Sequence, residues 1–223
     1  MERDAISQYT VLGTLEDRAV CMPYARPQVL REGRRRRQKI DGSWETIASV
    51  REDVALAADF IARSLKSPAA QKRWSPAELA LDAGGPWWAK TRDVFFHLQE
   101  AEQEWVLDRL PPTAATAASA VESGPIMNDW SWLWSQPALV APGKLRPRFR
   151  IPDLIGGVNW KQCDIVDLKT TIQPDLRAAG KKMGERGQFE KWKEILSAMR
   201  FEPRNSSVLV VSSLEDDYEW VGF

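Results

Sequence analysis

The chain is poor in the residues that build cross-links and metal cages. It has two cysteines, Cys21 and Cys163, which are far apart in the sequence, and a single histidine, His97. We therefore expect neither a disulfide framework nor a zinc site, and we expect a reducing, cytoplasmic setting. No apolar run approaches the roughly twenty residues that span a bilayer, and the first residues are charged and polar. Neither a membrane span nor a secretory leader is expected.

The chain also lacks net charge, because its 31 basic and 31 acidic residues cancel. A nucleic-acid partner is therefore not indicated by overall charge, and would have to be bound by local clusters of basic residues. One such cluster is the segment REGRRRRQK, residues 31–39. It is typical either of a solvated loop or of an arm that contacts phosphates.

Apolar periodicity is present along most of the chain and predicts an α/β protein. Helical spacing is found over residues 43–67, 75–85, 86–110 and 185–201, and Pro111 and Pro112 are expected to end the third of these helices. Strand patterns are found over residues 129–142, 146–157, 161–171, 206–214 and 218–223. Residues 7–15 suit a short strand, and residues 111–125 suit a loop or linker. We expect a mostly helical N-terminal extension over residues 1–85, which includes the basic segment, and a core over residues 86–223.

Charged residues interrupt two of the apolar strands. Asp153 follows Pro152, and fourteen residues later Asp167 and Lys169 share one face of the strand KQCDIVDLKTT. Because a glycine-bounded turn joins the two strands, we expect them to pair in antiparallel fashion and to bring Asp153 close to Asp167. Asp164 faces the other way by alternation and is left out of this group. The three side chains form either a structural ion network or a site that holds a cation against a phosphate.

The combination of Pro152-Asp153 with the segment IVDLKT resembles the PD-(D/E)XK nuclease superfamily, and in particular its RecB-like branch. The segment GQFEKW is similar to that branch's Gln-x-x-x-Tyr helix motif, with Gln188 in place and Trp192 where the family has tyrosine. The resemblance covers roughly residues 90–215. It implies a restriction-endonuclease-like core, in which a mixed central β-sheet is flanked by helices.

The resemblance also implies a set of site residues. Mg²⁺, or Mn²⁺ in its place, is expected to be bound by Asp153, Asp167 and the Leu168 carbonyl, with Lys169 orienting the attacking water. His97 and a glutamate on the same helix, Glu104 or Glu100, are expected to complete the metal shell. Gln188 is expected to position Lys169 or a substrate phosphate. His97 also suits a packed helix residue, and the glutamates a solvated face.

The implied activity is metal-dependent hydrolysis of phosphodiester bonds in DNA, during repair, recombination or defence against foreign DNA. Four basic residues near the predicted site are expected to contact the DNA backbone: Arg177, Lys181, Lys182 and Arg186. The alternative is an inactive subunit with a nuclease-like fold. Such a subunit would bind nucleic acid or dock on a helicase or another motor protein.

Overall fold

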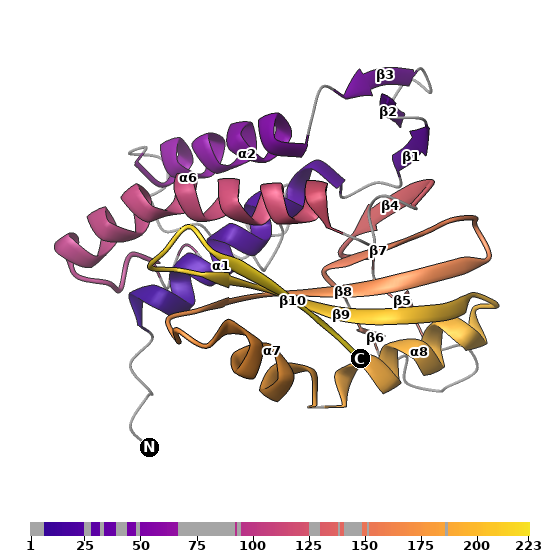
Figure 1. The fold of residues 1–223 in the computed structure, drawn as a ribbon. Helices are drawn as coiled ribbons and strands as arrows, with labels where there is room; N and C mark the ends of the chain where they lie inside the picture. The colour runs from indigo at the N-terminus through magenta and orange to yellow at the C-terminus, as the bar shows by residue number, and fades with distance from the viewer. Residues whose placement is uncertain are drawn as a thin grey trace.

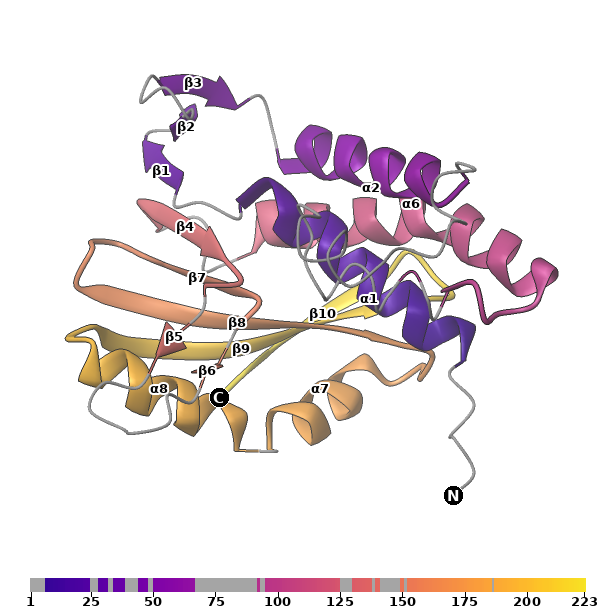
Figure 2. The same ribbon diagram turned by 180° about the vertical axis from the view of Figure 1, so that it is seen from behind.

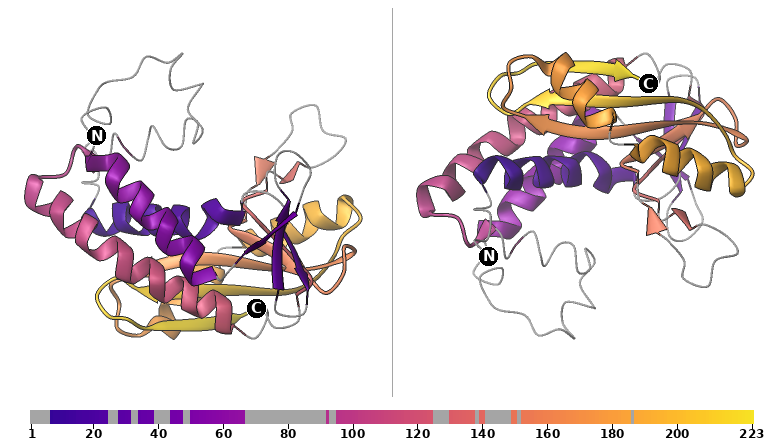
Figure 3. Two further views of the ribbon diagram at one scale, coloured as in Figure 1. Left: turned by 90° about the horizontal axis from the view of Figure 1, so that it is seen from above. Right: turned by 90° about the horizontal axis from the view of Figure 1, so that it is seen from below.

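The computed structural model describes residues 7–24, 28–31, 34–38, 44–47, 50–66, 92, 95–124, 130–137, 139–140, 149–150, 152–185 and 187–223. These residues form a mixed α/β fold, as predicted, in which helices cover both faces of a twisted β-sheet (Figure 1). The view from behind shows the same three layers, and the views from above and below show helices crossing the sheet on either side (Figures 2 and 3).

Within the described residues, eight strands form one sheet in the order β10-β9-β8-β7-β4-β1-β2-β3. In chain order they are β1 (Gln28–Arg31), β2 (Arg34–Gln38), β3 (Trp44–Ile47), β4 (Trp132–Ser135), β7 (Leu154–Gly157), β8 (Gln162–Thr171), β9 (Glu202–Ser212) and β10 (Tyr218–Gly222). Only β8 and β9 pair in parallel among them, so the sheet is mixed. Two short strands, β5 (Leu139–Val140) and β6 (Phe149–Arg150), pair separately.

Each face of the sheet has its own hydrophobic cluster. Helices α1 (Gln8–Cys21), α2 (Val50–Lys66) and α6 (Glu100–Ser123) cover one face, and α7 (Leu176–Gly184) and α8 (Gln188–Ala198) cover the other. Strand β8 contributes to both, because Val166 and Leu168 pack on the first side and Cys163 and Ile165 on the second. This split confirms the predicted alternation of β8.

Helix α1 lies directly against the sheet next to β8. Its side chains Val11, Leu12, Leu15 and Ala19 recur at three- and four-residue steps and are fully buried, and Ser7 accepts a capping hydrogen bond from the Thr10 amide. The strand predicted for residues 7–15 is therefore wrong. Gly13 allows the close approach, since a Cβ there would lie 3.1 Å from the Thr170 side chain.

The structure corrects the predicted elements at three further places. Residues 44–47 form β3, so the helix expected from residue 43 begins only at Val50. The basic segment contains strand β2, paired between β1 and β3, and not a loop. Helix α6 continues through Pro111 and Pro112 to Ser123, where a linker was expected. The helix predicted over residues 75–85 lies outside the described residues.

The N-terminal helices share one hydrophobic core with the sheet. The cluster on their side joins α1, α2 and α6 to residues of β7, β8 and β9. The predicted boundary between residues 85 and 86 lies outside the part of the chain that the structure describes. Among the described residues, no helix combines the length and the apolarity needed to cross a lipid bilayer.

Candidate active site

The pairing of β7 with β8 brings the predicted carboxylates together. Leu154 of β7 lies opposite Val166 of β8 in the antiparallel register, so Asp153, one residue before β7, is next to Asp167. Because β7 begins at Leu154, the edge of β8 beyond Val166 has no strand partner on this side among the described residues. The Asp153 side chain takes that place and accepts a hydrogen bond of 2.7 Å from the Leu168 amide.

Lys169 joins the two carboxylates. Its Nζ atom lies 2.7 Å from Asp167 Oδ1 and 3.7 Å from Asp153 Oδ2, and it donates to the Leu168 carbonyl at 2.9 Å. The Leu168 oxygen, predicted to face a metal ion, is thus held by Lys169 in this structure. The side chains of Asp153 and Asp167 are 14% and 4% exposed, so the cluster is largely shielded from water.

Gln188 approaches Asp167 from the other face of the sheet. It is the first residue of α8, and its amide nitrogen donates to Asp167 Oδ2. Gly187 precedes it at φ 69°, a left-handed conformation that glycine adopts without steric cost, and it turns the chain into α8. Trp192, one turn further on, is buried in the cluster beneath α8, where its ring contacts Phe189. Of the two residues in the predicted motif, Gln188 contacts a carboxylate and Trp192 packs in the hydrophobic core.

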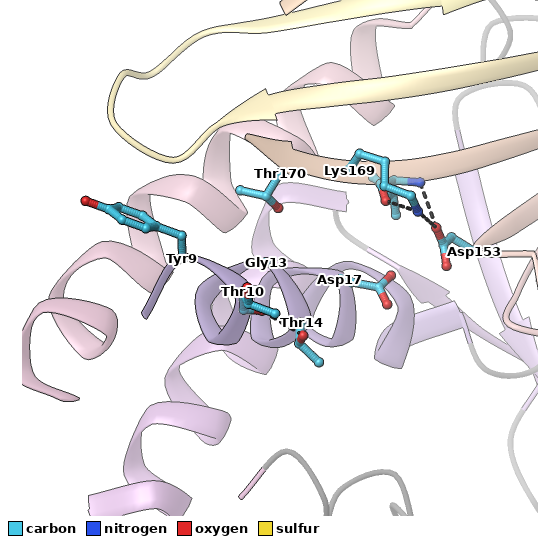
Figure 4. A pocket seen from close by; sticks show the side chains of 9 residues that line it. Tyr9, Thr10, Gly13, Thr14, Asp17, Asp153, Lys169 and Thr170 are labelled. Carbon is cyan, nitrogen blue, oxygen red and sulfur yellow. Dashed lines mark hydrogen bonds and ion pairs between the residues drawn. The ribbon is translucent and has the colours of Figure 1, made fainter. Parts of the chain in front are cut away.

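A third carboxylate reaches this group from α1. Asp17 lines the same cavity of about 440 Å³ as Asp153 and Lys169, and Figure 4 shows it on α1 facing them across the gap. Neither Asp17 nor its neighbour Glu16 was expected from the sequence. The signal was present, because Glu16 lies four residues after Leu12 and three before Ala19, which places an acid within the apolar stripe of α1.

Asp17 is held in place by neighbours from two elements. The Cys21 thiol donates to its Oδ1 at 3.2 Å, and the Gln136 side-chain amide donates to its Oδ2 at 3.0 Å. Gln136 has φ 44° and donates its backbone N–H to the Asp153 carbonyl at 2.8 Å. A left-handed backbone outside glycine costs free energy, so the surrounding contacts must stabilise it. Gln136 therefore ties Asp17 and Asp153 to the end of β4.

The site places three carboxylates, those of Asp17, Asp153 and Asp167, in a largely buried position beside a single lysine. Burial raises the pKa of Asp153 well above its usual range, the charges of Asp17 and Asp167 raise it further, and Lys169 opposes them. Burial also raises the pKa of Asp17, to about 6. For Lys169 burial lowers the pKa, but the charges of Asp153 and Asp167 outweigh this and the pKa lies above its ordinary value. Lys169 is therefore a cation at neutral pH, and the carboxylates around it favour additional positive charge.

The other predicted site residues lie away from this cavity. His97 and Glu104 are exposed and do not line it, and His97 precedes α6 instead of lying within a helix beside Glu104. Arg177, Lys181 and Lys182 are exposed on α7, on the opposite side of the sheet from α1. Arg186 lies outside the described residues.

The carboxylates fit a cation that keeps most of its water. Across the part of the chain that the structure describes, no three His, Cys, Asp or Glu side chains form a ready-made metal cage. Mg²⁺ does not need one, since it is commonly bound by one or two carboxylates together with waters and substrate phosphate oxygens. Asp153 and Asp167, with Asp17 opposite, supply that donor set.

Comparison with known proteins gives no relative from which a role can be transferred. No family model matches the chain, and neither a curated protein nor a solved structure matches it. The functional argument therefore depends on the geometry of the site alone.

Proposed function

We propose that the protein is a metal-dependent nuclease that hydrolyses phosphodiester bonds in DNA. The observation that carries the proposal is the contact of Lys169 with both Asp153 and Asp167 at the edge of β8, beside an open cavity. Perturbed acids that cluster with a cation in a cleft are typical of catalytic sites. The resemblance of Pro152-Asp153 and IVDLKT to the PD-(D/E)XK superfamily supports the same activity, and a mixed sheet with helices on both faces agrees with the arrangement that this resemblance implies.

In this proposal Asp153 and Asp167 hold the divalent cation, and Asp17 lies on the facing side of the same cavity. When bound, Mg²⁺ would lower the pKa of a water molecule and neutralise charge on the phosphate. Hydrolysis forms a bond from the water oxygen to phosphorus and breaks the ester P–O bond. The products are a phosphate monoester and a hydroxyl group, and the proton of the water ends on the leaving oxygen or in solvent.

The remaining roles follow from the contacts of each residue. Lys169 remains protonated, so its role is to stabilise the negative charge that develops on the phosphate, and not to remove a proton. Gln188 fixes the orientation of Asp167. Gln136 and Cys21 fix Asp17 in the same way. These residues position the carboxylates and need not touch the substrate.

The experiment is cleavage of labelled DNA in the presence of Mg²⁺ or Mn²⁺. We expect Lys169→Met and Asp167→Asn each to reduce the rate by about 100-fold or more, as expected for loss of a group that stabilises transition-state charge. Lys161→Met is the matched control, because Lys161 pairs with Glu202 at an exposed position. The absence of metal-dependent cleavage by the unsubstituted protein, on duplex DNA, single-stranded DNA and RNA alike, would overturn the proposal and favour the binding-subunit alternative.

A second control separates catalysis from a purely structural ion network. Asp164 is also buried on β8 and accepts hydrogen bonds from the side chains of Trp130, Arg204 and Asn205. Breaking such a buried charge pair costs about 3 kcal/mol, so Asp164→Asn should lower stability strongly. Asp167→Asn should cost less, about 1 kcal/mol, because Asp153 still pairs with Lys169 in that variant and the acidic neighbours of Asp167 repel its charge. Equal destabilisation of the two variants in urea would support the structural network.

A further inference from the structure

The cavity extends beyond the acidic cluster along α1. Tyr9, Thr10, Gly13 and Thr14 line it in addition to Asp17. These positions recur at three- and four-residue steps, so they lie along one face of the helix. Figure 4 shows them in a row, with Tyr9 at the end away from Asp153 and Lys169. The cavity is therefore elongated, with charge at one end and an aromatic ring at the other.

Its size fits one strand and not a duplex. The cavity measures about 440 Å³, which is within the range of about 300–1,000 Å³ typical of small-molecule sites. Along α1, the eight residue steps from Tyr9 to Asp17 correspond to about 12 Å at a rise of about 1.5 Å per residue. This space takes a nucleotide unit with its neighbouring phosphate. It is too small to take both strands of a double helix.

The chemistry of the lining suits a nucleotide. Thr14 donates its hydroxyl to the Thr10 carbonyl within α1 at 2.8 Å, so its oxygen keeps acceptor capacity towards the cavity. An acceptor at Thr14 suits an N–H donor of a base, because the phosphates and sugars within a DNA strand offer no donor. The Tyr9 ring is half-buried and packs edge-on against Trp105 of α6, with ring centroids 5.2 Å apart. That contact fixes the ring at the end of the cavity, where a base can stack on it.

We propose that the cavity binds single-stranded DNA, with a base against Tyr9 and the adjoining phosphate beside Asp153 and Lys169. The inference rests on the proposed nuclease function and names its substrate class, which is single strands, frayed ends or flaps. Duplex DNA without ends enters the cavity only where its strands separate. Tyr9 is thus a specificity-determining residue, and Thr14 contributes a hydrogen bond to the same strand.

The test is a binding measurement that does not depend on cleavage. Fluorescence anisotropy compares a labelled oligothymidine with a duplex closed by hairpins at both ends. The protein is the 223-residue chain with Lys169→Met, and the buffer contains Ca²⁺. Tyr9→Leu should weaken binding of the single strand about 10-fold, because a stacked base contributes about 1–3 kcal/mol. Binding to the closed duplex should not change. Tyr9→Phe keeps the ring and should keep the affinity.

Two further variants make the result decisive. Tyr218→Leu is the matched control, because Tyr218 is a half-buried tyrosine on β10 that does not line the cavity. Thr14→Val keeps the shape of the side chain and should cost about 5-fold in single-strand affinity, the effect of one hydrogen bond. It provides the test if loss of the Trp105 contact unfolds Tyr9→Leu, which a melting curve detects. Unchanged single-strand binding in a folded Tyr9→Leu or Thr14→Val variant, or equal losses on both DNAs, would overturn the proposal.

The outcome is separable from that of the nuclease proposal. If the unsubstituted protein does not cleave DNA but the Tyr9 variants discriminate strands, the cavity binds single strands and the catalytic role falls. If the protein cleaves DNA and the variants show no discrimination, the catalytic role stands and the strand assignment falls.

Discussion

At the scale of single residues, Glu16 and Asp17 are neighbours in α1 that lie in different surroundings, because consecutive helical residues point in different directions. Glu16 is 2% exposed and accepts a hydrogen bond from the Thr170 hydroxyl, whereas Asp17 faces the cavity. Burial raises the pKa of Glu16 to about 8, against the opposing effect of Thr170. Glu16 is therefore mostly protonated at neutral pH, and it anchors α1 to β8 without adding a full negative charge to the site.

This pKa predicts how stability depends on pH. Between the ordinary value of 4.5 and about 8, the folded protein keeps a proton on Glu16 that the unfolded chain has released. Unfolding therefore releases a proton, and the free energy of unfolding falls as pH rises, by up to about 1.4 kcal/mol per pH unit. Urea unfolding without divalent ions should show this slope, and Glu16→Gln should reduce it.

The control for this prediction is Glu190→Gln, because the Glu190 side chain is 79% exposed on α8. It should leave the slope unchanged. Asp17 and Asp153 also have raised pKa values, so part of the slope should remain in Glu16→Gln. An identical slope in Glu16→Gln and the unsubstituted protein would contradict the buried, protonated state of Glu16.

The residues of the site divide by whether they are close in the sequence. Asp153, Asp167 and Lys169 were predicted because a hairpin and strand alternation determine their neighbours over a short stretch of chain. Asp17 was missed because its place depends on α1 packing against β8, which joins residues about 150 positions apart. No local pattern reports such a contact, although the acid within the apolar stripe of α1 was a partial sign.

At the scale of secondary structure, α6 shows why a local rule gave the wrong boundary. Pro111 and Pro112 remove two backbone donors, which disfavours a helix by about 3 kcal/mol per proline in isolated peptides. In the folded chain, Ala114, Ala117 and Val121 after the prolines are fully buried against the other helices. Burial of this face outweighs the local cost, so the helix continues.

The prolines should therefore be replaceable with a gain in stability. Pro111 is exposed, so Pro111→Ala removes little packing and restores a donor for the helix. We expect the free energy of unfolding to rise by about 1 kcal/mol, less than the peptide value, because proline also restricts the unfolded chain. Urea denaturation measures it. The control is Thr116→Ala in the same helix. It restores no donor and should change the free energy of unfolding by less than about 0.7 kcal/mol.

A loss of stability in Pro111→Ala would mean that packing requires the proline geometry at this point of α6.

The other elements also differ in whether local sequence or distant pairing determines them. Strands β7 to β10 and helix α8 were predicted because their periodicity is strong over their own length. Strands β1 to β3 were not predicted, because their pairing with β4 places an arginine-rich segment in a sheet against its local pattern.

At the scale of the whole molecule, the sequence predicted the α/β class but not the place of the N-terminal region. An extension was expected, whereas α1 and α2 pack in the same cluster as the central strands. Helix α1 closes one side of the cavity and supplies Asp17. The described N-terminal helices are thus part of the core that positions the proposed site, and the expected order of extension followed by core does not describe them.

The hydrophobic core is divided into two clusters, one on each face of the sheet, and each contains one cysteine. Each cysteine can therefore report when the helices on its face separate from the sheet. Cys21 belongs to the cluster under α1 and Cys163 to the cluster under α7 and α8, and both are at most 1% exposed. Burial raises the pKa of the Cys21 thiol well above its ordinary value and that of Cys163 to about 12. Each thiol is unreactive until its layer detaches from the sheet.

Labelling kinetics of Cys21→Ser and Cys163→Ser variants with a thiol reagent should therefore time the opening of each layer separately. Pro111→Ala should slow labelling of Cys21 and leave that of Cys163 unchanged, because only the first lies in the α6 layer. Equal slowing at both thiols would show that the two layers open in one cooperative step.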